Sequence, residues 1–371
     1  MIYLDNGATT LHKPPSVSDA VRRALFTCGN PGRGGHRAAM AAANTVYRCR
    51  EQAAKLFSCQ PEQVAFTGSC THGLNIAIRS LVEPGDPVVI SGFEHNAVTR
   101  PLYALGAKAL VAGRKLFDPE DTLYDFEKAL KSGVKAAIFT HTSNVFGYAL
   151  PVEEMAQLCR SYHVPFVLDA AQGAGVSEIS LQQLGAAFIA APGHKGLLGP
   201  QGTGLLICGE KPKPLIFGGT GSASRQQQMP EELPDAIEAG TLNVPGIAGL
   251  EAGISYILKT DPKKIWEKER KQTKNCTNRL KELGFQVFSG PYQGGTVSFL
   301  PGYDCEEFAA YLAERDIAVR AGLHCAPLAH ESAGTLESGT VRVSFGHDCA
   351  PWQVEAFLDG IKWVLHKKYL Q

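Results

Sequence analysis

Short apolar runs alternate with helix-like segments between about residues 60 and 210, and this alternation constrains the fold more than any other feature. The runs have the length of buried strands, and the segments between them, such as 71–81, 152–162 and 181–184, repeat apolar residues at helical spacing. This pattern is typical of an α/β domain whose mainly parallel sheet is covered by helices on both faces. We predict six strands: Val64–Thr67, Pro87–Ser91, Ala136–Thr140, Pro165–Asp169, Ala186–Ala191 and Thr203–Cys208.

The pattern changes after residue 210. Residues 211–235 hold four of the 22 prolines and a Gly-Gly-Thr-Gly-Ser stretch, which indicates a long irregular segment that serves a site or an interface. Lys263–Leu283 is predicted to be a solvated connecting helix, because acidic and basic side chains are interleaved along it. Beyond residue 285 the order is α+β, with the clearest strands at Gln286–Ser289, Gly295–Leu300 and Val341–Phe345.

We therefore expect two domains and a short N-terminal segment. Residues 1–14 form the segment, which is expected to pack with the small domain, and residues 15–250 form the large domain. Residues 251–371 form a smaller α+β domain that carries a loop around Cys325. A chain of 371 residues that is 44% hydrophobic is long enough for a core of this extent.

Charge and cysteine content argue against several classes of protein. Lys plus Arg and Asp plus Glu both number 36, so no overall basic field attracts nucleic acid or an anionic membrane. No apolar stretch reaches membrane-spanning length and the N-terminus lacks the features of a signal peptide, so we expect a cytoplasmic protein. The ten cysteines are scattered and include no C-x-x-C pair, which argues against a disulfide framework or a metal site.

Polar residues follow the predicted strands at the ends that face one crevice in an open parallel sheet. After the first strand, Thr67-Gly68-Ser69-Cys70-Thr71 begins a helix, and its N–H groups and hydroxyls suit a phosphate. His95 follows the next strand and can stack on an aromatic ligand. Asn144 follows the third and offers an amide to a ring hydroxyl or a substrate carboxylate. Taken alone, each is equally well explained by a helix cap, a structural histidine or a turn.

Two further strand ends are more specific. Asp169 ends an apolar strand, where a desolvated carboxylate needs a partner such as a protonated pyridine nitrogen. Lys195 leaves Ala186–Ala191 in a glycine-rich loop near apolar surface, where its amine can lose its proton, as a Schiff-base lysine must. Alone, Lys195 would be read as a solvated loop lysine. The ordered set of a phosphate cradle, a stacking ring, a pyridinium partner and this lysine indicates pyridoxal 5′-phosphate (PLP) as the cofactor.

Four motifs carry a family resemblance: Tyr3-Leu4-Asp5-Asn6-Gly7-Ala8-Thr9-Thr10, Asp169 with Gln172, His194-Lys195, and Glu238-Ala239-Gly240-Thr241-Leu242-Asn243. On these motifs the chain resembles, nearly end to end, the class V aminotransferase-like PLP enzymes. Within that class it is most similar to the group II cysteine desulfurases and selenocysteine lyases. The resemblance implies the PLP-dependent transferase fold type I, with a large domain built on a mainly parallel sheet and a smaller α+β C-terminal domain.

The resemblance also implies roles around the cofactor ring. Lys195 would form the Schiff base and move protons, and Asp169 would pair with the pyridine nitrogen. Gln172 would touch the ring hydroxyl, and His95 would stack on the ring as a third catalytic residue beside Lys195 and Cys325.

Other residues would bind the phosphate by the same resemblance. Cys70 and Thr71, at the start of the predicted helix, and His194 would hold it. Thr241 would reach the phosphate of a partner subunit, which implies a homodimer with sites at the interface.

The sequence departs from the family pattern at two places in the cofactor site. Pro192 stands where relatives often have a phosphate-contacting serine, so one hydroxyl and one N–H are lost. His72 stands where many relatives have glutamate. Both changes leave the phosphate affinity and the surroundings of the ring open.

The C-terminal half supplies groups for a substrate. Arg342 lies between two valines in a predicted strand, and its planar fork matches an amino-acid α-carboxylate. Cys325 lies in a loop with His324 before it and Arg320 five residues back, and nearby positive charge favours the thiolate. By the resemblance Cys325 is the sulfur-accepting residue, whereas His324 could be a loop residue without a chemical role. The loop from Cys325 to Gly339 is expected to be able to move.

Together these features predict a PLP-dependent cysteine desulfurase. It would convert L-cysteine to L-alanine and leave the sulfur as a persulfide on Cys325, for a thiol or a sulfur-acceptor protein to take. The alternatives are a selenocysteine lyase acting on L-selenocysteine, another PLP-dependent aminotransferase, epimerase or β-lyase of this fold, and a non-catalytic sulfur carrier or scaffold. The presence of Lys195, Asp169 and Arg342 argues against the last.

Overall fold

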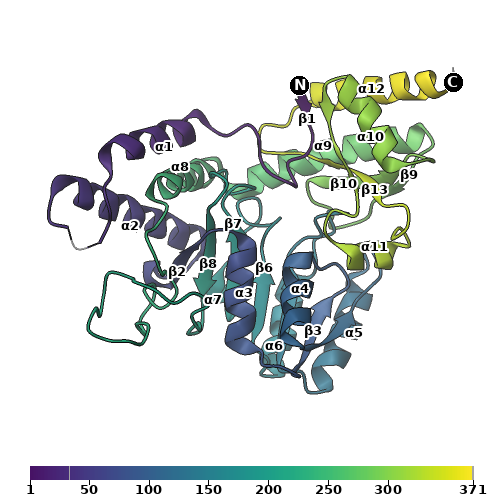
Figure 1. Ribbon diagram of the computed structural model, residues 1–371. Coiled ribbons are helices and arrows are strands. Elements are labelled where there is room, and N and C mark those ends of the chain that lie inside the picture. Colours follow the sequence, from purple (N-terminus) through teal and green to yellow (C-terminus); the bar gives the residue numbers. More distant parts are fainter. Residues whose placement is uncertain (33, 370–371) are drawn as a thin grey trace.

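A seven-stranded sheet forms the centre of the larger part of the molecule in the computed structural model, which describes residues 1–32 and 34–369 (Figure 1). In spatial order its strands are β2 (Val64–Thr67), β8 (Gly204–Cys208), β7 (Phe188–Pro192), β6 (Phe166–Asp169), β5 (Ala136–Thr140), β3 (Pro87–Ser91) and β4 (Lys108–Ala112). The pairs from β7 to β4 are parallel, and β8 runs antiparallel to both of its neighbours. The central strands are buried on both faces, as their continuous apolar sequences require.

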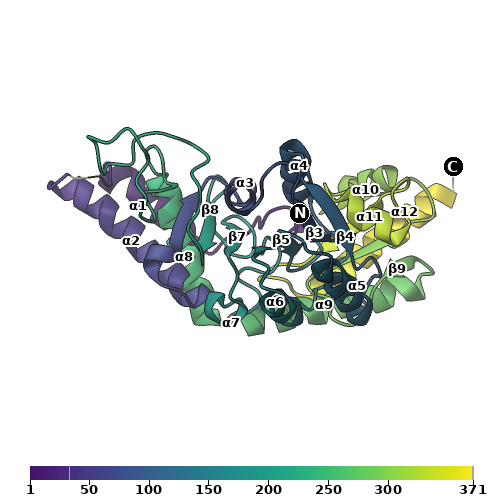
Figure 2. The same ribbon diagram turned by 90° about the horizontal axis from the view of Figure 1, so that it is seen from below.

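Helices cover both faces of this sheet (Figure 2). On one face lie α3 (Cys70–Leu81) and α4 (Asn96–Leu105), whose apolar side chains form one core with the strands. A second, larger core lies on the other face. It includes side chains of α2 (Arg37–Phe57), α5 (Pro119–Lys131), α6 (Val152–Ser161), α7 (Leu181–Leu184) and α8 (Val244–Thr260).

Two N-terminal helices extend this part of the molecule on the side of β2. α1 (Pro15–Thr27) and α2 both pack against α8, and a 3₁₀ turn (Pro61–Gln63) leads from α2 into β2. Residues 209–243, between β8 and α8, are all described and contain no helix or strand, as the proline and glycine content predicts.

The C-terminal part contains two smaller sheets. A parallel pair joins β1 (Ile2–Tyr3) to β11 (Ile317–Ala318). An antiparallel sheet has the order β12 (Arg320–Gly322), β13 (Thr340–Ser344), β10 (Thr296–Leu300) and β9 (Gln286–Phe288). The helices here are α9 (Pro262–Glu282), α10 (Cys305–Glu314), α11 (Pro327–Ala333) and α12 (Pro351–Tyr369). A third core lies between the antiparallel sheet, α10 and α12.

The long helix α9 connects the two parts of the molecule, but it is less solvated than its sequence indicates. Ile265 near its start lies in the core of the large sheet, while Cys276 and Leu280 near its end lie in the C-terminal core. Most of its charged residues lie on the outer face, but Glu269 is buried together with Ile265, Cys276 and Leu280. The prediction of a solvated connecting helix was therefore wrong for one face.

The predicted fold class is confirmed, and the bounds of β2, β3 and β5 match the predicted runs residue for residue. The edge strand β4 was not predicted, because its first three residues are exposed and carry neither a continuous apolar run nor a clear alternation. The domain boundaries at residues 14 and 250 stay a prediction. None of the helices described in residues 1–32 and 34–369 has the length and apolar character needed to cross a membrane.

Candidate active site

The register of the sheet brings the predicted strand ends together. Thr140 of β5 pairs with Asp169 of β6, which pairs in turn with Ala190 of β7. The loops that follow these strands, with Asn144, Asp169 and Lys195, therefore leave the sheet at the same edge.

The Lys195 loop is crowded, and its glycines are needed for steric reasons. A Cβ at Gly193 would clash with the side chain of Thr203, and a Cβ at Gly196 would clash with the carbonyl oxygen of Ala174. Lys195 itself is half-buried. Burial lowers the pKa of its amine, and the nearby carboxylate of Asp169 opposes this shift. The amine that sequence reasoning predicts is thus present beside the predicted carboxylate.

Asp169 is 2% exposed and lies within reach of several predicted residues. One of its oxygens accepts hydrogen bonds from the N–H of Ala171 at 2.9 Å and from the thiol of Cys70 at 3.5 Å. Burial raises the pKa of Cys70, and Asp169 adds to this, so the thiol stays protonated and donates. Cys70 therefore contacts the carboxylate of Asp169 directly. The family resemblance predicts Cys70 only as a phosphate-binding residue.

His95 caps α4, and its ring nitrogen Nδ1 accepts a hydrogen bond from the N–H of Ala97 at 3.0 Å. Burial lowers the pKa of His95, with Asp169 opposing and Lys195 adding to the shift, so the ring is neutral. The preceding residue, Glu94, is fully buried and ties two strand ends together: its carboxyl accepts from the hydroxyl of Ser91 and from the N–H of Thr140. Sequence reasoning missed Glu94, although an acid directly before His95 was visible.

The start of α3 has the geometry of an ordinary capped helix with free N–H groups. Ser69 accepts the N–H of His72 at 3.1 Å, and the first N–H groups of the helix have no acceptor within it. Thr71 is exposed at this end. The His72 ring accepts from Gly68, while its buried Nε2 atom has no partner in the described structure.

The N-terminal segment holds the lysine loop in place. Thr10 donates its N–H to the carbonyl of His194 and its hydroxyl to that of Lys195, both at 3.0 Å. The hydroxyl of Thr9 lies 3.0 Å from Nδ1 of His194, and burial, with Lys195 nearby, lowers the pKa of that ring to about 4. The His194 ring is therefore engaged by the chain itself. The two threonines belong to the N-terminal motif, but their contacts could not be predicted from it.

Gln172 donates its side-chain amide to the carbonyl of Gly7 at 3.0 Å, so the same segment also fixes this residue. Gln172 and Lys195 line a cavity of about 40 Å³, together with Glu269 and His347 from the C-terminal part. Burial raises the pKa of Glu269 to about 8, so its carboxyl is mostly protonated at neutral pH.

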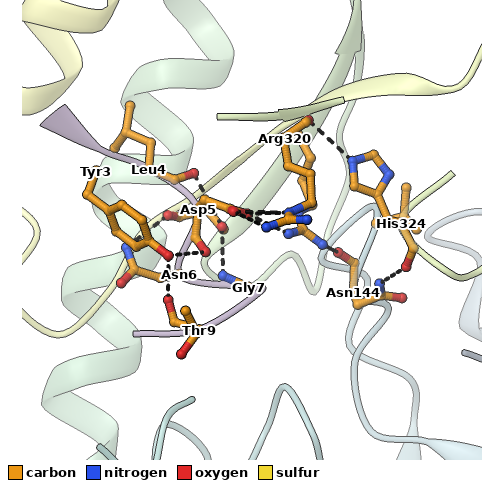
Figure 3. Close-up of polar contacts among 12 residues, drawn as sticks. Tyr3, Leu4, Asp5, Asn6, Gly7, Thr9, Asn144, Arg320 and His324 are labelled. Atoms are coloured by element: carbon orange, nitrogen blue, oxygen red, sulfur yellow. Dashed lines mark hydrogen bonds and ion pairs between the residues drawn. The ribbon is translucent and has the colours of Figure 1, made fainter. Parts of the chain in front are cut away.

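Arg342 on β13 is 2% exposed and belongs to a network between the two parts of the molecule. Its guanidinium lies 2.8 Å from Asp5 and donates to the carbonyl of Asn144 at 3.0 Å. Arg320 is a second partner of Asp5, at 2.7 Å (Figure 3). The Nε atom of Arg342 and the Oδ1 atom of Asn144 are both buried without a partner in the described structure.

Cys325 is exposed and lies in a turn that contacts Asn144 and the start of α4. Its carbonyl accepts the N–H of Asn96, the first residue of α4, at 2.7 Å. The carbonyl of His324 accepts the side-chain amide of Asn144 at 2.8 Å. The loop after Cys325 is more ordered than its composition indicates, because residues 327–333 form α11 and the Ser332 hydroxyl donates to the carbonyl of Gly92 at 2.8 Å.

Thr241 lies elsewhere. It is exposed in the segment 209–243 and lines a cavity with Arg50 and Glu238, which form a buried ion pair. Within one chain it is not part of the crevice around Lys195.

The fold and the site together define the class of protein. The sequence model of the family described as aminotransferase class-V matches residues 2–357, and this chain belongs to that family. The family assignment covers the sheet, the Lys195 loop, the Cys325 loop and Arg342.

Relatives within this family give a closer comparison. A probable cysteine desulfurase of Pyrococcus abyssi is 34% identical, over 96% of this chain and 92% of the relative. A probable cysteine desulfurase of Methanothermobacter thermautotrophicus is 31% identical, over 92% and 89%. The apo structure of a cysteine desulfurase from Thermococcus onnurineus is 31% identical and superposes with a TM-score of 0.90, covering 98% of this chain and 94% of that chain.

Proposed function

We propose that this protein is a PLP-dependent cysteine desulfurase that converts L-cysteine to L-alanine and transfers the sulfur to Cys325. The observation that carries the proposal is the arrangement of four predicted residues. Lys195 lies near Asp169, while Arg342 and the turn of Cys325 are joined through Asn144, which follows the strand next to that of Asp169. The similarity to cysteine desulfurases over nearly the whole chain supports it.

The residues present fit PLP. Asp169 is a buried carboxylate whose hydrogen bonds within the described residues, from an N–H and a thiol, both fall on Oδ1, so its carboxylate can also accept the N–H of a pyridinium ring. His95 offers a neutral ring and α3 offers free N–H groups. When bound, PLP supplies an electron sink for charge that develops on the substrate carbon. Gln172, Thr71, Cys70 and His194 are the proposed remaining contacts, and Thr241 is proposed to reach the phosphate of a second subunit.

Arg342 is the proposed anchor for the substrate carboxylate. Its Nε–H is buried and free, and one side of the guanidinium already contacts Asp5. A carboxylate that accepts from Nε would satisfy the unpartnered donor, which otherwise costs about 1–3 kcal/mol. We propose that the free amide oxygen of Asn144 faces the substrate amino group or the ring hydroxyl.

Lys195 is the proposed acceptor of the substrate Cα proton. Burial lowers the pKa of this amine, so it gives up its own proton more readily and can then take the substrate proton. The glycines around it and the two threonine contacts hold the amine at a fixed place. The same amine then returns the proton to the carbon from which sulfur has left.

Cys325 is the proposed sulfur acceptor. Its thiolate attacks the substrate sulfur, so that an S–S bond forms while the Cβ–S bond of the substrate breaks. The electron pair of that bond stays on the carbon fragment, which takes a proton and leaves as alanine. A thiol or a sulfur-acceptor protein then removes the outer sulfur of the persulfide. L-selenocysteine can bind through the same groups, and we propose it as a second candidate substrate to be compared in the same assay.

The decisive experiment measures alanine and persulfide. Holoenzyme with L-cysteine should form alanine, and mass spectrometry should find 32 mass units added to Cys325, the mass of one sulfur atom. Cys325→Ser should lose sulfur transfer while keeping the visible absorbance of bound PLP. Unchanged sulfur transfer by this variant would refute the role of Cys325. Sedimentation analysis would test the homodimer, and fractionation of cells would test the expected cytoplasmic location.

A further inference from the structure

The turn that carries Cys325 has an unfavourable backbone. The N–H of Ala326 donates to the carbonyl of Leu323 at 2.9 Å, which closes a tight turn around His324 and Cys325. Both central residues have positive φ angles, 51° and 55°, in the left-handed region that residues other than glycine rarely adopt. Two consecutive residues of this kind persist only where surrounding contacts hold them.

Two hydrogen bonds from the large part of the molecule, one from the loop after β5 and one from the start of α4, hold the backbone of this turn. The side chain of Asn144 donates to the carbonyl of His324, and the N–H of Asn96 donates to the carbonyl of Cys325. Because Arg342 donates to the carbonyl of Asn144, the same asparagine connects the turn to the proposed carboxylate anchor. The position of the thiol is thereby set relative to the substrate.

A pair of histidine rings holds the turn from the other side. The rings of His324 and His330 are nearly parallel, at 11°, with centroids 5.6 Å apart, and His330 also packs against Phe146. Nδ1 of His324 lies 3.4 Å from Nε2 of His330, whose Nδ1 lies 2.8 Å from the hydroxyl of Thr335. Nε2 of His324 lies 3.3 Å from the carbonyl of Arg320.

The chemistry of these contacts fixes the protons. A carbonyl only accepts, so Nε2 of His324 carries hydrogen and its Nδ1 accepts from Nε2 of His330. Nδ1 of His330 then accepts from the hydroxyl of Thr335. Both rings are neutral in this chain of bonds, in agreement with burial, which lowers the pKa of His324 to about 2 and that of His330 to about 4.

We propose that His324 and His330 are positioning residues for Cys325. The paired rings hold the left-handed turn in one preformed conformation, from which the thiol is presented to the substrate sulfur. This inference rests on the proposed role of Cys325. It explains why a short turn, without glycine at its two left-handed positions, can place a nucleophile as firmly as the crowded loop places Lys195.

The test separates the ring from the backbone. His324→Gly keeps the left-handed turn accessible but removes the ring, and His330→Phe keeps an aromatic ring but removes both of its hydrogen bonds. We expect each to lower kcat for alanine formation about ten- to a hundredfold, with KM for L-cysteine nearly unchanged.

Two further variants serve as rescue and control. The side chain of His330→Gln can still donate and accept hydrogen bonds, so this variant should keep much of the wild-type kcat. His163→Gly is the matched control, because His163 is an exposed left-handed histidine outside this cluster, and it should behave as wild type.

Two further readouts do not depend on catalysis. Amide exchange of residues 323–327 should speed up in His324→Gly and His330→Phe, and the rate at which iodoacetamide alkylates Cys325 should change, while the absorbance of bound PLP stays the same. Wild-type kcat, exchange and alkylation in both variants would overturn the proposal. If wild type itself forms no alanine, the proposed function fails instead, and the exchange and alkylation rates still decide whether the ring pair holds the turn.

Discussion

The two loops that carry the reactive side chains are built in opposite ways. The Lys195 loop contains glycines where the chain passes close to Thr203 and Ala174, and its position follows from these local steric limits. The Cys325 turn has no glycine at its two left-handed positions, and bonds from Asn96, Asn144 and the His330 ring hold it. The lysine loop is therefore restricted by close packing as well as by its bonds with the N-terminal segment, whereas the cysteine turn depends on hydrogen bonds from its neighbours.

This difference has a consequence for how each loop tolerates change. Added atoms should damage the lysine loop, because it has no free space. Removed contacts should damage the cysteine turn, because its backbone conformation is unfavourable on its own. The following changes test this contrast, from the largest expected effect to the smallest.

Lys195→Ala removes the amine but leaves the glycines of the closely packed loop in place. Alanine formation should fall roughly 10²–10⁴-fold, because a general base contributes an effect of this size. The measurement is kcat/KM for L-cysteine together with the absorbance of PLP, which should change as the Schiff base is lost. Lys115→Ala, at an exposed lysine, should leave both unchanged. Retained activity in Lys195→Ala would show that Lys195 is not the base.

Asp5→Ala removes a carboxylate from the network that connects the N-terminal segment, Arg342 and Asn144. It leaves the buried guanidinium of Arg342 without its charged partner, and breaking such a pair costs about 3–5 kcal/mol of unfolding free energy. Urea unfolding measures this loss. Asp19→Ala provides the control, since its pair with Arg22 is exposed and should contribute little. Equal losses from the two variants would show that Asp5 is not part of a buried network.

Gly196→Ala adds one methyl group to the lysine loop. The new Cβ would clash with a backbone oxygen of Ala174, so we expect a loss of about 1–3 kcal/mol in stability. Thermal unfolding of the holoenzyme gives the measurement. Gly219→Ala, where a Cβ meets no atom within 4 Å, should be neutral. If Gly196→Ala is as stable as wild type, the loop has more freedom than its packing indicates.

The two regions should also lose stability at opposite ends of the pH range. On the lysine side, burial and Asp348 raise the pKa of Glu269 from 4.5 to about 8, and Lys268 opposes this shift. The stability that goes with the protonated carboxyl of Glu269 is therefore fully present below pH 4.5 and is lost as pH rises through about 8. On the cysteine side, burial lowers the pKa of His330 from 6.5 to about 4. The stability that goes with the neutral ring of His330 is therefore fully present above pH 6.5 and is lost as pH falls through about 4.

Two substitutions isolate these contributions. Glu269→Gln should gain stability relative to wild type as pH rises from about 4.5 to about 8, and His330→Gln should gain it as pH falls from about 6.5 to about 4. Urea unfolding at several pH values measures both differences. Parallel curves for wild type and either variant would contradict the corresponding assignment.

The large sheet and the residues at its strand ends could be predicted from the sequence. Buried parallel strands read as continuous apolar runs, so Asp169 and the Lys195 loop were found simply as the polar residues that follow them. The order of the motifs then indicated the chemistry. The strand ends at Thr140 and Asp169 are adjacent because the fold class itself requires it.

The contacts between distant segments could not be predicted. The bond from Cys70 to Asp169 joins residues 99 positions apart, and the pairing of Asp5 with Arg342 joins residues 337 positions apart. The His324–His330 ring pair depends on the conformation of the turn and of α11. No spacing in a single sequence encodes such pairs. The short helix α11 was not predicted, although Pro327 at its first position and Gly334 after its end are helix signals.

The N-terminal segment has a consequence for the synthesis of the chain. Asn6 donates its side-chain amide to the carbonyl of Ser344, which lies 338 positions later, and Thr10 binds the lysine loop. At roughly 5–20 residues per second, the ribosome adds Ser344 about a quarter of a minute to a minute after Asn6. Residues 6 and 10 can therefore complete their contacts only after synthesis has passed Ser344, so this side of the site is assembled late in the making of the chain.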